Sequence, residues 1–134
     1  MSDILTLADA RTIIAAAEKR ALEIGRPQNI AVVDDGGNLI AHVRMDGAWR
    51  GSVDISINKA WTARSFDVET KALAEKSQPG EPFFGIQASN GGRVMIFAGG
   101  IPLQRNGRIV GGIGVSGGDG EQDQTVAEAG VAAL

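Results

Sequence analysis

Basic, acidic and hydroxyl side chains gather in the second quarter of the chain, where their types and spacing suit the binding of an anion. Arg44 and Asp46 stand two residues apart, and Lys59 and Thr62 are three apart, which places them on one face of a helix. Arginine can grip a carboxylate with two hydrogen bonds, while lysine acts as a point charge. The pattern predicts a pocket for a carboxylate-bearing ligand. The alternative interpretation is a set of surface ion pairs worth under about 1 kcal/mol.

The same residues can also carry acid–base chemistry. Lys59 and Asp46 are the candidate catalytic acid and base, and Arg44 is the candidate anchor for the carboxylate of a substrate. A buried Lys59 with a lowered pKa is also a candidate for Schiff-base formation. His42, the only histidine in the sequence, is a candidate ligand-binding residue, although a lone histidine is more often an ordinary surface or core residue.

Glycine-rich segments complete the candidate pocket. Gly36–Gly37 predicts a turn, because glycine alone enters positive φ without steric cost. Gly99–Gly100 predicts either close packing against another backbone or a pocket wall. The segment from Gly111 to Gly117 lacks the strand-to-helix turn of a dinucleotide-binding fingerprint. The candidate ligand-binding residues are Arg44, Thr62, Gly99, Gly100, Pro102, Ser116 and His42.

Hydrophobic periodicity and turn signals predict the elements that must position these residues. Apolar residues at spacings of three and four predict a first helix over residues 7–24, with Thr6 and Asp9 at its start and Gly25 at its end. A second helix is expected over 53–66, a shorter one over 69–76, and a last one after a capping box formed by Asp119 and Gln122. Strands are expected over 30–33, 39–44, 94–97, 101–104 and 108–115.

Composition excludes several classes of protein. The 134 residues suit one domain, expected to span 1–134, and contain no cysteine, which excludes thiolate metal sites and thiol nucleophiles; no metal site is predicted. A net charge of −3 without a basic run gives no footprint for nucleic acid. No stretch reaches the roughly 20 apolar residues of a membrane helix, and the first residues do not read as a signal peptide, so a cytoplasmic location is expected.

Five segments in register resemble the GlcG/HbpS family, which includes the C-terminal domain of PduO-type corrinoid adenosyltransferases. They cover essentially the whole chain. The segments are Ile30–Gly37, Arg44–Ala48, Lys59–Ala63, Gly99–Leu103 and Val110–Gly117.

The resemblance implies a profilin-like α/β (α+β) sandwich, in which helices flank five antiparallel strands, and a homo-oligomer of two to eight chains. It also implies haem binding for some members, and His42 is then the candidate haem ligand in this chain. Asn38 stands where many members have histidine. We therefore expect a protein that binds a small anionic ligand, haem or another tetrapyrrole. A catabolic enzyme acting on a small carboxylated metabolite and a non-catalytic oligomeric accessory protein are the alternatives.

Overall fold

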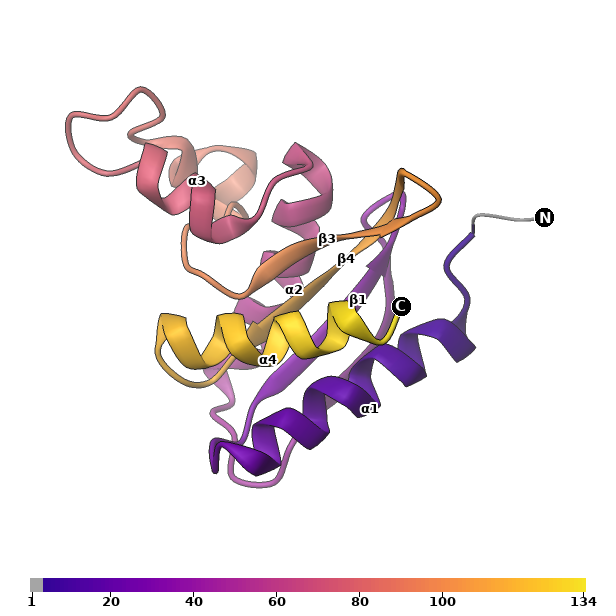
Figure 1. The fold of residues 1–134 in the computed structure, drawn as a ribbon. Helices are drawn as coiled ribbons and strands as arrows, with labels where there is room; N and C mark the ends of the chain where they lie inside the picture. The colour runs from indigo at the N-terminus through magenta and orange to yellow at the C-terminus, as the bar shows by residue number, and fades with distance from the viewer. Residues whose placement is uncertain (1–3) are drawn as a thin grey trace.

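The structure is a computed structural model that describes residues 4–134. Helices pack on both faces of a single antiparallel sheet (Figure 1). The elements are α1 (Leu7–Glu23), β1 (Asn29–Asp34), β2 (Leu39–Arg44), α2 (Gly51–Phe66), α3 (Thr70–Lys76), β3 (Gly100–Arg105), β4 (Arg108–Ser116) and α4 (Gly120–Ala132), with short 3₁₀ turns at Ile86–Ala88 and Asn90–Gly92.

The two helix starts for which capping residues were predicted are capped as their sequences indicate. The Thr6 side chain accepts a hydrogen bond from the Asp9 amide, and the Asp9 carboxylate accepts one from the Thr6 amide. Asp119 and Gln122 form the same reciprocal pair at the start of α4. Each capping box satisfies two amide groups that the first helical turn leaves without partners.

The four strands lie in the order β2-β1-β4-β3, and every neighbouring pair is antiparallel. The two predicted hairpin turns are present. Asp34 Oδ1 accepts hydrogen bonds from the amides of Gly36 and Asn38, and Asn106 and Gly107 both have positive φ, as a tight two-residue hairpin turn requires.

The main core lies between the sheet and the helices α1 and α4, which run beside each other over one face (Figure 1). Alternate residues of β1 and β4 supply the sheet side of this core, because successive side chains of a strand point to opposite faces. Its fully buried members include Ile13, Ala17, Ile30, Val32, Leu103, Ile113, Val115 and Val126.

Helix α2 covers the opposite face, where β1 supplies the small apolar residues Ala31 and Val33 and β4 presents glycines. Gly114 of β4 pairs with Gly100 of β3, and Gly112 lies two residues before Gly114 on the same face. A Cβ added to Gly112 would lie 2.5 Å from the carbonyl oxygen of Ala60, and one added to Gly100 would lie 2.7 Å from that of Lys59. The late glycines therefore let α2 approach the sheet closely enough to bring Lys59 over β4.

The predicted strand over residues 94–97 does not form, so the described residues contain four strands, not five. The Met95 amide donates to the side chain of Thr62 on α2 rather than to a neighbouring strand. Val94 is buried while Phe97 is exposed, so the segment runs as an irregular wall beside α2. Among residues 4–134, no helix has the length and apolar character needed to cross a membrane.

Candidate functional site

A cavity of about 360 Å³ lies where α2, the end of β4, the start of α4 and the segment before β3 meet. We call it the Lys59 cavity. Its wall is mostly apolar and includes two aromatic rings, while its charged members are one lysine and one aspartate. The lining residues are Trp49, Ser52, Ile55, Lys59, Ala74, Ile96, Phe97, Ala98, Ser116, Gly118, Gly120 and Asp123.

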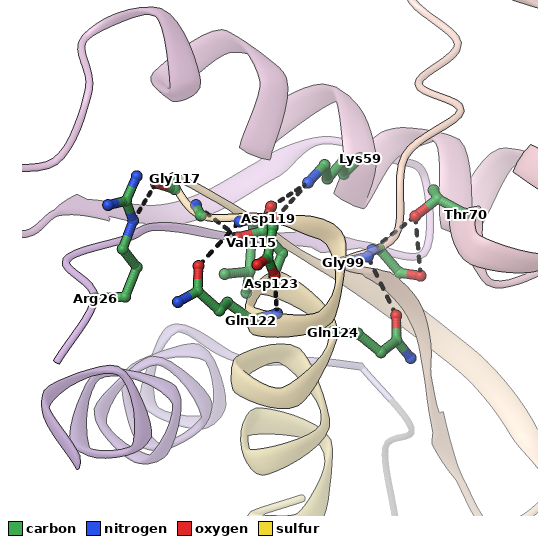
Figure 2. A network of polar contacts seen from close by, with 12 residues as sticks. Arg26, Lys59, Thr70, Gly99, Val115, Gly117, Asp119, Gln122, Asp123 and Gln124 are labelled. Carbon is green, nitrogen blue, oxygen red and sulfur yellow. Dashed lines mark hydrogen bonds and ion pairs between the residues drawn. The ribbon is translucent and has the colours of Figure 1, made fainter. Parts of the chain in front are cut away.

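Lys59 and Asp123 form a buried ion pair in the lining of this cavity. Lys59 Nζ lies 3.0 Å from Asp123 Oδ2 and donates a second hydrogen bond of 2.8 Å to the carbonyl oxygen of Val115 (Figure 2). The other carboxylate oxygen of Asp123 accepts the Gly118 amide at 2.9 Å. Only 2% of the Lys59 side chain and 5% of the Asp123 side chain are exposed. The pair thus joins α2, β4 and α4 through charged hydrogen bonds.

Burial lowers the pKa of the Lys59 ammonium below its ordinary value, because desolvation penalises the charged form. Attraction to the Asp123 carboxylate and the hydrogen bond between them oppose this shift but do not cancel it. Lys59 is therefore easier to deprotonate than a surface lysine, while the neighbouring carboxylate still favours the charged form.

Three hydrogen-bond donors in the cavity lining have no acceptor within residues 4–134. An ammonium has three N–H groups, and Lys59 uses two of them. The hydroxyls of Ser52 and Ser116 make no hydrogen bond to the rest of the described chain, although the two residues are only 4% and 5% exposed. Because these donors open onto the cavity, their acceptors must come from water or from a bound ligand.

Residues from α2 hold the irregular segment that forms one wall of the cavity. The Thr62 hydroxyl accepts the Met95 amide at 3.0 Å and contacts the Arg93 carbonyl oxygen at 3.5 Å. The Arg93 guanidinium stacks over the Trp61 ring, 4.3 Å from its centroid, and its Nε donates to Asn58. These contacts position Ile96 and Phe97, which line the cavity.

The structure divides the predicted site residues between two hollows. Lys59 and Ser116 line the Lys59 cavity, whereas Arg44 and Asp46 line a separate hollow of about 500 Å³ between the end of α1 and β2. The expectation that these four residues share one pocket is therefore wrong. None of the described residues that line the larger hollow forms a buried ion pair, which makes the Lys59 cavity the stronger candidate site.

The other predicted site residues support the cavity or lie away from it. Gly99, with φ of +119°, lies so close to Lys59 that an added Cβ would be 3.1 Å from Nζ, and its amide donates to Gln124. Gly100 donates its amide to the Thr70 hydroxyl at 2.8 Å. Pro102 lies on the edge strand β3, where the missing amide is tolerated. His42 lies on the other edge strand, β2.

Sequence reasoning missed Asp123 and Ser52. Asp123 lies 64 residues beyond Lys59 and reads as one more acidic residue in the first turn of a capped helix. The available signal was the position of Asp123, one residue after the capping box. At this position its side chain lies beside the residues that follow β4, and it accepts the Gly118 amide. Ser52 precedes the predicted start of its helix and has no local motif.

Comparison with known proteins identifies the family. Residues 5–132 match the family described as "Haem degrading protein HbpS-like". The chain belongs to the HbpS-like family. The expected GlcG/HbpS membership is thereby confirmed.

Relatives of the HbpS-like chain match it over most of its length. It is 45% identical to an uncharacterized 15.0 kDa protein from the dhaT-dhaS intergenic region of Citrobacter freundii, over 92% of this chain and 87% of that protein. The crystal structure of Klebsiella pneumoniae protein ORFY is 42% identical, with a TM-score of 0.95 and coverage of 99% and 92%. The crystal structure of a PduOC:heme complex is 34% identical, with a TM-score of 0.94 and coverage of 98% and 95%.

Proposed function

We propose that the protein binds a small organic carboxylate in the Lys59 cavity. The observation that carries the proposal is the set of three free donors in the cavity lining, from Lys59, Ser52 and Ser116. An ionised carboxylate accepts several hydrogen bonds and has no hydrogen-bond donor, so it is complementary to a set of free donors. The apolar and aromatic remainder of the lining suits a hydrocarbon or ring body, as in most small-molecule sites.

Two further features support an anionic head group. The first turn of α4 begins at Gly120, which lines the cavity, and the start of a helix carries partial positive charge. Of the acidic residues at this helix start, Asp119 and Glu121 line other hollows, and Asp123 lines this one as the partner of Lys59. Lys59 and Asp123, the charged members of the lining, neutralise each other, so a bound anion adds one negative charge that the free donors and the start of α4 stabilise.

Haem, the ligand of the PduOC complex, fits this cavity poorly. The usual axial ligands of haem iron in proteins are histidine, methionine, cysteine and tyrosine; this chain has no cysteine or tyrosine, and the described lining contains none of the four. Met45 lines the other hollow, but its sulfur already accepts the Gln28 amide. His42 lines neither hollow, and its Nε2 atom is buried without a partner among residues 4–134. The residues present thus favour a ligand smaller than haem.

A thermal-shift screen tests the proposal. Benzoate and 2-oxobutanoate are the carboxylate probes, benzyl alcohol is the uncharged match for benzoate, and haemin is the tetrapyrrole probe. We expect the carboxylates to raise the melting temperature in a saturable way, because a ligand that binds only the native state stabilises it. Benzyl alcohol should have a much smaller effect, and haemin should give no saturable Soret shift.

Matched serine variants assign the binding to the cavity. Ser116→Ala removes one donor and should weaken carboxylate binding about tenfold, the size of one hydrogen bond to a charged group. Ser65→Ala, at an exposed position on α2, is the control and should bind as the wild type does. Equal binding by both variants, or no response to any carboxylate, would contradict the proposal.

A further inference from the structure

The Lys59 cavity places a carboxylate base beside a cluster of donors, and this juxtaposition goes beyond ligand binding. Asp123 Oδ2 lies 3.0 Å from Lys59 Nζ, and both residues line the cavity together with the free hydroxyls of Ser52 and Ser116. Pre-positioned donors stabilise an oxygen that becomes negative during a reaction, most strongly where water is excluded. A carboxylate within reach of the same ligand can accept a proton.

We propose that Lys59 and Asp123 catalyse proton transfer at the carbon next to the carbonyl group of a bound 2-oxo carboxylate. This inference rests on the proposed function, because it needs the carboxylate bound in the Lys59 cavity. It also reassigns the acid–base pair: Asp46, the expected partner of Lys59, lines the other hollow, and Asp123 takes its place.

The step balances within the site. Asp123 takes a proton from the carbon next to the carbonyl, and the electron pair of the broken C–H bond forms a C=C bond. The electrons of the carbonyl π bond move to the oxygen, where hydrogen bonds from the Lys59 ammonium and one serine hydroxyl stabilise the resulting enolate, while the other serine hydroxyl holds the carboxylate. Return of a proton from Asp123 to the same carbon regenerates the substrate, so no oxidant, reductant or further reactant is required.

The ion pair itself assigns the two roles. A carboxylate 3.0 Å from the amine favours the ammonium form of Lys59, which is a donor and not a base. Asp123 keeps its two oxygens hydrogen bonded, to Lys59 and to the Gly118 amide, and a carboxylate oxygen has further lone pairs for the transferred proton. An imine between Lys59 and the ligand carbonyl is the competing mechanism, because it also loosens the neighbouring C–H bond.

Hydrogen–deuterium exchange in D₂O tests the inference. Proton NMR follows the loss of the C3 hydrogens of 2-oxobutanoate with and without protein, and thermal shift measures binding of the same compound. We expect wild-type protein to accelerate exchange, and Asp123→Asn to lower the accelerated rate by about 10²–10⁴-fold, the usual share of a positioned acid or base. Glu121→Gln, an exposed carboxylate-to-amide change in the same helical turn, should leave the rate unchanged.

Benzoate, which has no such hydrogen, separates folding and binding from catalysis. An Asp123→Asn variant that still binds benzoate but exchanges at the wild-type rate would overturn the role of Asp123. If this variant does not fold, Ser52→Ala and Ser116→Ala decide, since each should lower exchange in the saturated complex about tenfold.

Three wild-type outcomes complete the test. Saturable binding of 2-oxobutanoate without accelerated exchange overturns the inference and leaves the proposed function standing. Absence of binding by every carboxylate probe overturns both. Covalent trapping of 2-oxobutanoate on Lys59 by borohydride, seen as a mass increase that Lys59→Arg abolishes, would replace the enolate mechanism with an imine.

Discussion

At the scale of single residues, the stability of the protein depends on the buried ion pair between Lys59 and Asp123. The Lys59 ammonium and the Asp123 carboxylate are both removed from water, and each is the charge that compensates the other. Removing one partner of such a pair leaves an isolated buried charge, whereas removing both leaves none. The pair therefore stabilises the junction of α2, the end of β4 and the start of α4.

Lys59→Met tests this dependence. The change leaves the Asp123 carboxylate buried with the Gly118 amide as its remaining partner, so we expect the free energy of unfolding to fall by about 3–5 kcal/mol. The double variant Lys59→Met/Asp123→Asn should lose less than the sum of the two single changes. Urea denaturation of all four proteins measures the coupling, and strictly additive losses would show that the two side chains do not interact.

His42 makes stability depend on pH in mildly acidic solution. Burial lowers the pKa of its imidazole below the ordinary value of 6.5, so the unfolded chain binds a proton more readily than the folded chain. The contribution of His42 to the free energy of unfolding is therefore lowest at acidic pH. It rises as the pH increases from the folded-state pKa to the unfolded-state pKa of about 6.5, and it is constant above that pH.

The difference in the free energy of unfolding between wild type and His42→Gln isolates this effect, because the carboxylates of the chain are common to both proteins. We expect the stability difference between the two proteins to shift in favour of wild type as the pH rises toward 6.5, and then to remain constant. Chemical denaturation at half-unit steps of pH gives the curve. A difference independent of pH would mean that His42 titrates alike in the folded and unfolded chains.

At the scale of elements, glycines decide how closely α2 approaches the sheet. The sheet face toward α2 carries Gly100, Gly112 and Gly114 in neighbouring positions, and the helix backbone occupies the space that side chains would fill. Lys59 can reach β4 and Asp123 only because this separation is short. The same glycines resemble a nucleotide loop in sequence, but here they serve packing.

Gly112→Ala should force α2 away from the sheet. The added Cβ would lie 2.5 Å from the carbonyl oxygen of Ala60, a backbone atom that cannot move alone. We expect a loss of about 1–3 kcal/mol in the free energy of unfolding, together with weaker carboxylate binding. Gly51→Ala, at the open start of the same helix, is the matched control and should not be destabilising. Unchanged binding in a destabilised Gly112→Ala variant would uncouple the cavity from this packing.

At the scale of the whole molecule, aromatic side chains remain on the surface around the irregular segment between α3 and β3. Phe83, Phe84 and Phe97 lie in this segment, with exposed fractions of 47%, 61% and 56%, and Trp49 is also exposed. Figure 1 shows the segment projecting from one end of the sandwich beyond α3. Large exposed apolar groups are typical of surfaces that associate with another protein.

We expect the chain to form a homo-oligomer through this projecting surface. Phe84→Asp should shift the species toward smaller assemblies, because a charge in an apolar interface must be desolvated without a partner. Light scattering coupled to size exclusion measures the mass of each protein, with Leu22→Asp, an exposed apolar position on α1, as the control. A wild-type protein that is monomeric at all concentrations would contradict the prediction.

Local signals in the sequence were sufficient for most elements and for the family. The capping boxes at Thr6 and Asp119, the Asn106–Gly107 turn and the helical spacing of apolar residues act over a few residues, so each could be read without knowing the rest of the fold. Residues 94–97 show the limit of such reading. Their composition favours a strand, but the hydroxyl of Thr62, more than 30 positions away, binds the amide that a strand would have used.

The tertiary structure alone decided the membership of the site. Lys59 could be identified as a candidate from its type and helical position, but its partner lies 64 residues away on another helix, and no spacing rule connects the two. Arg44 and Asp46, closer in sequence, lie in another hollow because β2 is an edge strand beside the end of α1. Local hydrogen bonds and periodicity determine elements, whereas long-range packing determines which side chains face the same cavity.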